Sequence, residues 1–258
     1  ALEIQKNVTI KDKGNERESA AARALTDADF IVQEGLLRFF MDQNYQFGIF
    51  AEEKSPYRDV FPKNSEYTIS LDPIDGTLAY KNNLPNFCTV IGVYKNGYLE
   101  GSMVHTPFDK KIFCATQNGA SWVYEGDYKR NYNCGDNKSN LVLASSKTAG
   151  EIRKSLEDNG LILTNPDIDP NIGLNSIFRS KIAAFFRKRA SCLDWGPIAL
   201  IIDKSGGIVS DYNGKKQDVY QIWGRKDSGE DYYTPSILCS SNEKIHTKLI
   251  NILAQNSS

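Results

Sequence analysis

Hydrophobic and polar positions follow two different patterns along this chain of 258 residues, and the first half mainly predicts strands joined by tight turns. Apolar positions recur at helical spacing over residues 27–43, where Thr26 and Asp29 have the spacing of a capping box. Mobile or surface loops are expected at residues 11–18 and 54–65. Strands, two of them joined by the Asn96-Gly97 hairpin signal, are predicted at residues 7–10, 47–51, 67–70, 87–95, 98–104, 111–115 and 121–124.

The second half alternates strands with helices instead. Gly206-Gly207 should end one of these helices, and a polar link is expected at residues 165–175. Strands are predicted at residues 141–144, 161–164, 208–210 and 237–239, and helices at residues 149–159, 194–204 and 242–253. The change of pattern predicts an α/β (α+β) fold with an N-terminal α+β half at residues 1–140 and a C-terminal α/β half at residues 141–258.

Composition excludes several classes of function. The 31 Lys and Arg residues balance 32 Asp and Glu residues, so overall charge attracts neither nucleic acid nor an anionic membrane. No apolar run approaches the roughly 20 residues of a membrane span. The five cysteines lack Cys-x-x-Cys spacing, which indicates reduced thiols and predicts a cytoplasmic protein. Because the chain has only two histidines, any metal is expected to bind through oxygen.

Acidic side chains stand where predicted strands end or predicted helices begin. Asp72 and Asp75 follow the strand at residues 67–70, and the others are Asp29, Glu52 and Asp194. Each alone has an ordinary explanation as a polar turn, a helix cap or a solvated loop charge. If they converge, two carboxylates about 4 Å apart repel by about 4 kcal/mol at an effective dielectric constant of 20. A cluster therefore predicts a bound cation, and Mg²⁺ prefers carboxylate, carbonyl and water oxygens.

The stretch Leu71-Asp72-Pro73-Ile74-Asp75-Gly76-Thr77 resembles the Asp-Pro-Ile/Leu-Asp-Gly-Thr signature of the inositol monophosphatase family, a family of metal-dependent, lithium-sensitive phosphatases. Other stretches resemble further motifs of this family and stand in the same order: Thr26 to Asp29, Ala51 to Glu53, Cys192 to Trp195 with Ser205 to Gly207, and Ile237 to Cys239. The resemblance implies the layered αβαβα sandwich of the inositol monophosphatase and fructose-1,6-bisphosphatase type. It also implies a homodimer.

The resemblance further implies a site with two or three Mg²⁺ ions. Glu52, Asp72 and the Ile74 carbonyl would hold one ion, while Asp72, Asp75 and Asp194 would hold a second. Two ions in such a site clamp the attacking and leaving oxygens of an in-line displacement. The implied catalytic residues, which orient or deprotonate the attacking water, are Glu52, Thr77 and Asp29. The implied substrate-binding residues are Asp75, Gly76, Thr77, Ser145, Arg187 and Asp194.

Two features of the chain depart from the family pattern, and the first of them concerns the substrate. Inositol-specific members place a Glu where this chain has Arg187, within the basic segment at residues 179–189. This segment is either a solvated face or a second contact for an anion. Asp194-Trp195 reverses the family's usual Trp-Asp order, and Ile74 is typical of the inositol-type branch.

The predicted function is therefore a Mg²⁺-dependent phosphomonoesterase for a small phosphorylated polyol, with inositol monophosphate as the leading substrate. The alternative within the same chemistry is an adenosine 3',5'-bisphosphate nucleotidase, which the basic segment at residues 179–189 favours. A third hypothesis, from a different class, is a non-catalytic regulatory member that binds RNA or RNA polymerase. The balanced charge and the full set of acidic residues argue against it.

Overall fold

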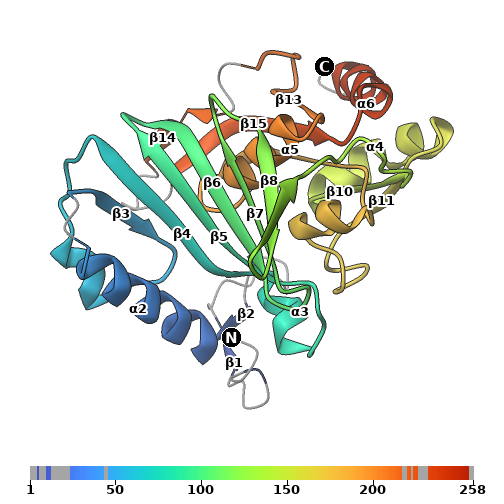
Figure 1. Cartoon of the computed structure of the whole chain (residues 1–258). Coiled ribbons are helices and arrows are strands. Elements are labelled where there is room, and N and C mark those ends of the chain that lie inside the picture. Colours follow the sequence, from blue (N-terminus) through green and yellow to red (C-terminus); the bar gives the residue numbers. More distant parts are fainter. Residues whose placement is uncertain are drawn as a thin grey trace.

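The computed structural model describes residues 5, 10–12, 24–43, 46–216, 220–221, 223–225 and 232–255, and two mixed sheets dominate it (Figure 1). The first is a seven-stranded sheet whose spatial order follows the sequence. Only β3 and β4 are parallel, and the other neighbours are antiparallel. Its strands are β3 (Gly48–Ala51), β4 (Tyr67–Asp75), β5 (Cys88–Lys95), β6 (Tyr98–Thr106), β7 (Lys111–Thr116), β8 (Ser121–Glu125) and β9 (Tyr128–Asn131).

The second sheet has six strands in the order β11-β10-β12-β15-β13, with β14 also paired to β15. β10 is parallel to β11 and β12, whereas β15 is antiparallel to its three neighbours. Its strands are β10 (Leu141–Ala144), β11 (Ile162–Thr164), β12 (Ala184–Ser191), β13 (Ile208–Ser210), β14 (Trp223–Arg225) and β15 (Tyr232–Ser240). The predicted boundary at residues 140 and 141 falls between β9 and β10, so each sheet draws its strands from one predicted half.

Helices form the outer layers and the layer between the sheets (Figure 1). The α-helices are α2 (Asp27–Met41), α3 (Thr77–Lys81), α4 (Ser146–Asp158), α5 (Trp195–Lys204) and α6 (Glu243–Gln255). Two 3₁₀ helices, η2 (Pro56–Val60) and η3 (Leu174–Arg179), and a small antiparallel pair of β1 (Ile10–Asp12) and β2 (Ala24–Thr26) complete the described elements.

Helix α5 is the central layer because its apolar residues cover its whole circumference. Residues 195–202 are all buried, and one core cluster joins them to residues of both sheets. The Ser102 hydroxyl on β6 donates to the Pro197 carbonyl at 2.8 Å and anchors the helix to the first sheet. Leu37 of α2 packs on β4, while α4 and α6 pack on the opposite face of the second sheet. The predicted αβαβα layering is confirmed.

Most predicted elements are confirmed to within a few residues, but two predictions need correction and several elements had no prediction. β4 runs on to Asp75, where a turn was expected after residue 70. The loop predicted at residues 54–65 contains η2, and the sequence pattern predicts no element at the positions of β2, α3, β9, β12 and β14. β1 begins at Ile10 and ends at Asp12. Residues 7–9 of the strand predicted at 7–10, and residues 13–18 of the loop predicted at 11–18, lie outside the described residues. Among the described helices, none is long and apolar enough to cross a membrane.

Candidate active site

The end of β4 places Asp72 and Asp75 on the same side of the strand through an irregular register. Asp72 pairs with Val90 on β5 and Asp75 pairs with Cys88, so three steps along β4 correspond to two along β5. Such a bulge re-aims side chains that strict alternation would send to opposite faces. The carbonyl of Pro73, which lies within the bulge, accepts a hydrogen bond from the Thr89 hydroxyl at 2.9 Å.

Gly76 follows β4 in a conformation that the sharp turn into α3 requires. Its φ is 90°, in the left-handed region, and a Cβ atom there would lie 2.7 Å from the Asn86 carbonyl oxygen. Both the positive φ and the close carbonyl oxygen therefore exclude any residue other than glycine at this position. The next residue, Thr77, donates from its hydroxyl to the Ile74 carbonyl at 3.2 Å, which closes the turn.

Asp194 reaches the same point from the second half of the chain, as the residue that caps α5. Its carboxylate accepts from the Trp195 backbone amide at 2.8 Å, and a negative charge is favourable at a helix N-terminus. The Tyr94 hydroxyl on β5 donates to the Cys192 carbonyl at 2.8 Å, which holds the start of α5 against the first sheet. Packing of the helix between the two sheets thus brings Asp194 to the end of β4.

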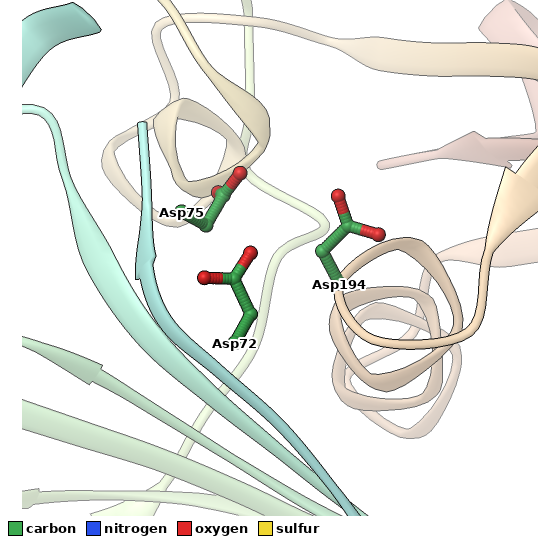
Figure 2. A group of neighbouring side chains, drawn as sticks. All are labelled: Asp72, Asp75 and Asp194. Carbon is green, nitrogen blue, oxygen red and sulfur yellow. The ribbon is translucent and has the colours of Figure 1, made fainter. Parts of the chain in front are cut away.

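The three carboxylates converge. One oxygen from each of Asp72, Asp75 and Asp194 lies within 4.8 Å of the others, and Figure 2 shows the three side chains side by side, Asp194 at the start of the helix. Asp72 is 6% exposed, and its Oδ1 is a buried oxygen without a hydrogen-bond partner. We call these three residues the acidic centre.

Burial and the negative charges of nearby carboxylates raise the pKa of every member of the acidic centre. The pKa of Asp72 lies well above its usual range because of burial and then the charges of Glu52, Asp75 and Asp194. Burial raises the pKa of Asp75 to about 6 and, together with the charge of Asp75, that of Asp194 to about 7. Because burial disfavours these anions without a cation, the orphaned Asp72 oxygen and the all-oxygen donor set fit a hard ion such as Mg²⁺.

Glu52 lies beside the acidic centre because β3 runs parallel to β4. Its backbone amide donates to the Leu71 carbonyl at 3.1 Å, and the negative charge of its carboxylate helps to raise the pKa of Asp72. Gln33 of α2 fixes the following residue, since its side chain exchanges hydrogen bonds of 2.8 and 2.9 Å with the Glu53 backbone. The structure therefore brings a fourth predicted carboxylate to the site.

Two predicted residues lie elsewhere. Asp29 is buried near the start of α2, and its charge, after burial itself, helps to raise the pKa of Tyr80 to about 12. Ser145 directly follows β10, which neighbours the strand that carries Arg187. Neither belongs to the acidic centre, and their roles stay predictions.

Cys88 is a neighbour of the acidic centre that the sequence pattern did not single out. Its thiol donates to Asp75 Oδ2 at 3.5 Å and opposes the rise in the pKa of that aspartate. Burial and the nearby carboxylates raise the pKa of the thiol itself. An apolar β run carries this cysteine, and only the pairing of Cys88 with Asp75 across β4 and β5 reveals the contact.

The basic segment at residues 179–189 does not form one surface. Arg179 donates to Asp109 Oδ2 at 2.7 Å and to the Asn86 side chain and the Pro85 carbonyl, so its charge is used inside the fold. Arg187 instead is exposed on β12, and its charge lowers the pKa of Asp194. The prediction of a single solvated or anion-binding segment is therefore too coarse.

Comparison with known proteins places the whole chain in one group. The model of the inositol monophosphatase family matches residues 1–258. The fructose-1,6-bisphosphatase/inositol-1-monophosphatase of Thermotoga maritima is 25% identical over 221 residues, which are 84% of this chain and 78% of the relative. The inositol monophosphatase of Dictyostelium discoideum is 24% identical over 229 residues, 84% of this chain and 82% of that protein. Nus factor SuhB of Salmonella typhimurium is 20% identical over 254 residues, 95% of this chain and 92% of the factor.

Solved structures share the fold at low sequence identity. The IMPase of Thermotoga maritima superposes with a TM-score of 0.71 at 18% identity and covers 99% of this chain and 91% of its own. An IMPase/NADP phosphatase complexed with Mg²⁺ and phosphate has a TM-score of 0.72 at 16% identity, with 100% of this chain and 90% of that chain covered. At these identities the likeness supports the fold, and the site rests on the residues described above.

Proposed function

The chain belongs to the inositol monophosphatase family, a family of metal-dependent phosphatases, and from this we propose that it hydrolyses a small phosphorylated polyol with Mg²⁺ as cofactor. Inositol monophosphate is the leading candidate substrate. The observation that carries the proposal is the acidic centre, in which three carboxylates from β4 and α5 meet within 4.8 Å. Such a cluster costs free energy unless a cation joins it.

The proposed metal ligands are the acidic centre together with Glu52 and the carbonyl of Ile74, for two or three Mg²⁺ ions. The buried, unpartnered Asp72 oxygen supports this assignment, as does the charge of Glu52, which lies close enough to raise the pKa of Asp72. When bound, Mg²⁺ supplies positive charge that stabilises the phosphoryl oxygens and makes a water more acidic. Asp72 would be a ligand together with Glu52 and together with Asp75 and Asp194, since the charges of all three raise its pKa.

Three residues are proposed to act on the attacking water. Glu52 lies beside Asp72 and can accept a proton, while the Thr77 hydroxyl can orient the water. Asp29 is the third, and its place outside the acidic centre is an argument for an indirect role. The Thr77 hydroxyl donates to the Ile74 carbonyl, which orients it at the end of β4.

The proposed substrate contacts surround the same turn. The backbone amides of Gly76 and Thr77 are offered to the phosphate group, because the missing Cβ of Gly76 allows close approach. The carboxylates Asp75 and Asp194 are proposed to accept hydrogen bonds from substrate hydroxyls. Ser145 and Arg187 are proposed to contact the part of the substrate farther from the ester. We further propose a homodimer that works in the cytoplasm, and light scattering of the purified chain tests the dimer.

The test of the function is phosphate release from a panel of phosphomonoesters with Mg²⁺, with EDTA, and with Mg²⁺ plus Li⁺. We expect turnover of inositol 1-phosphate that needs Mg²⁺ and falls with Li⁺. The matched variants are Asp75→Asn, which removes a proposed ligand, and Asp109→Asn, which removes a carboxylate that pairs with Arg179 outside the acidic centre. Turnover that persists in EDTA, or in Asp75→Asn, would overturn the proposal.

A second candidate is an adenosine 3',5'-bisphosphate nucleotidase, and the exposed charge of Arg187 next to Asp194 favours it. Parallel measurement of kcat/KM for this nucleotide and for inositol 1-phosphate separates the two. A non-catalytic RNA-binding role has less support, because Arg179 is paired inside the fold. Salt-sensitive RNA binding without any phosphate release would favour that role instead.

A further inference from the structure

The face of β12 that looks toward α5 carries an aromatic contact and a cation on the same ring. Phe185 meets Trp195 edge to face, with ring centroids 5.3 Å apart. Arg187, two residues farther along the strand, has its guanidinium carbon 5.5 Å from the centroid of the same Trp195 ring. Residues two apart on a strand share a face, so both side chains point toward the start of α5.

The neighbouring cation points the other way. Lys188 has its Nζ 6.0 Å from the centroid of the Tyr212 ring, which also meets Phe186 at a centroid distance of 6.1 Å. Phe186 and Lys188 therefore occupy the opposite face of β12. Of these two adjacent basic residues, only Arg187 faces the helix that carries Asp194.

Arg187 stands at the rim of the acidic centre. Trp195, the ring beneath its guanidinium, directly follows Asp194 and donates its backbone amide to that carboxylate at 2.8 Å. The positive charge is close enough to oppose the rise in the pKa of Asp194. The acidic centre therefore has one cationic edge, on the side of β12.

The guanidinium is available to a ligand. The side chain of Arg187 is exposed, and within the part of the chain that the structure describes its guanidinium makes neither an ion pair nor a hydrogen bond. Arg179 on the nearby η3 is the contrast, because its donors are used by Asp109, Asn86 and Pro85. Stacking on Trp195 orients the planar fork of Arg187 in advance, which lowers the entropy that a ligand must remove.

We infer that Arg187 is a specificity-determining residue that binds a second oxyanion of the substrate. The inference rests on the proposed function and, among its phosphomonoesters, favours those that carry another phosphate or a carboxylate over inositol monophosphate, the leading candidate named there. An Arg fork matches the two oxygens of such a group, and a charge-assisted pair strengthens binding more than contact with an uncharged hydroxyl. An uncharged polyol on the monoester leaves this cation without a partner.

A different role for Arg187 is to compensate the charge of the acidic centre. In that role its removal weakens metal binding and slows the turnover of all phosphomonoesters by a similar factor. Binding of a second oxyanion predicts a loss confined to substrates that carry one. The two roles are separated by the ratio of kcat/KM for two substrates that differ only in that group. Weaker metal binding lowers kcat/KM by the same factor for both substrates and leaves this ratio unchanged.

The experiment uses the full chain with saturating Mg²⁺ and two matched substrate pairs. Inositol 1,4-bisphosphate is compared with inositol 1-phosphate, and 6-phosphogluconate with glucitol 6-phosphate, so the second group is a phosphate in one pair and a carboxylate in the other. The variants are Arg187→Gln, which removes the charge, and Arg187→Lys, which keeps the charge without the fork. Lys188→Gln is the control on the opposite face of the strand. Circular dichroism verifies that each variant is folded, and calorimetry measures Mg²⁺ binding.

For the wild type we expect kcat/KM at least about 10-fold higher for the member of one or both pairs that carries the second oxyanion. Arg187→Gln should lower this preference by about 10- to 100-fold, Arg187→Lys by less, and Lys188→Gln should keep it. Phosphate release without such a preference, or an equal loss for both members of each pair in Arg187→Gln, would overturn this inference and leave the proposed function standing. Absence of Mg²⁺-dependent release from every ester would overturn the proposed function, and this inference with it.

Discussion

Helix α5 has an acidic side chain near each end, and the two ends differ in how the protein compensates the charge. At the C-terminal end the Asp203 carboxylate lies 2.6 Å from Lys216 Nζ and 3.8 Å from Lys204 Nζ, with its own side chain 5% exposed. At the N-terminal end Asp194 faces two more carboxylates. In the described ranges no Lys or Arg lies within ion-pair distance of the acidic centre.

This difference separates a structural carboxylate from one kept for a ligand. A buried carboxylate that has its own lysines is compensated in the folded protein, even though an exposed partner contributes little free energy. A group of carboxylates without an ion-paired lysine or arginine makes the folded state less stable until an external cation binds. Substitutions, metal binding and changes of pH should therefore have different effects on stability and activity at the two ends of α5.

The largest effect is expected from Asp194→Asn, which removes one charge from the acidic centre. Phosphate release should fall by more than about 100-fold, because even residues that only support metal ligands cost about 10- to 100-fold. The unfolding free energy of the metal-free protein should rise by on the order of 1 kcal/mol, since repulsion is relieved. The measurements are steady-state kinetics and urea unfolding in EDTA. Asp203→Asn is the control, and it should lower stability with activity kept.

Mg²⁺ should raise the melting temperature of the wild type, because it binds the folded acidic centre and relieves the repulsion there. At a concentration 100 times the dissociation constant, binding adds about 2.7 kcal/mol to the unfolding free energy. The same titration on Asp194→Asn should show a much smaller shift, while Asp203→Asn should respond as the wild type does. Equal shifts in all three proteins would place the metal elsewhere.

The stability of the metal-free protein should fall as the pH rises from about 4 to about 7. Folding raises the pKa of Asp75 to about 6 and that of Asp194 to about 7, so the folded state holds protons that the unfolded state releases near pH 4. The unfolding free energy therefore decreases over this window. Thermal melts from pH 4 to pH 8 in EDTA check the slope, and saturating Mg²⁺ at pH 8 should reverse the loss. A rise in stability over the same window would contradict the assignment.

The smallest effect is expected from Lys216→Ala at the opposite end of the helix. The lysine side chain is 58% exposed, so its ion pair with Asp203 is screened by water and is worth roughly 0.2–1 kcal/mol. Activity and Mg²⁺ affinity should be unchanged, which kinetics and calorimetry can check, while urea unfolding measures the small loss of stability. A loss of activity here would show that the two ends of α5 are not independent.

Local pattern predicted most of the fold because the elements concerned have strong signals of their own. The Asn96-Gly97 turn has φ values of 50° and 82°, as the hairpin signal requires, and α2 begins directly after Thr26. β9 escaped prediction because its four residues are all exposed, so its sequence has no alternation to detect. The extension of β4 through Asp75 escaped because a bulge, not a turn, accommodates Pro73.

The candidate site divides in the same way. Asp72, Asp75 and Glu52 follow recognisable strands, and the order of the family motifs along the chain is enough to connect them with Asp194. Cys88 could not be predicted, because its contact with Asp75 depends on the register between β4 and β5. Arg187 and Lys188 point to opposite faces because both lie in the strand at residues 184–191. The run of basic residues in this strand hides its pattern, so the sequence did not predict it.

The sequence by itself determined the elements, the family and the identity of the acidic residues, since periodicity, turn chemistry and ordered motifs are local properties of the chain. Only the tertiary structure decided which charges meet. Asp194 reaches Asp72 because residues 195–202 of α5, which are all buried, pack between two sheets, and Arg179 is paired while Arg187 lies over an aromatic ring because η3 and β12 face different neighbours. Electrostatic energy depends on distance and burial, and packing sets both.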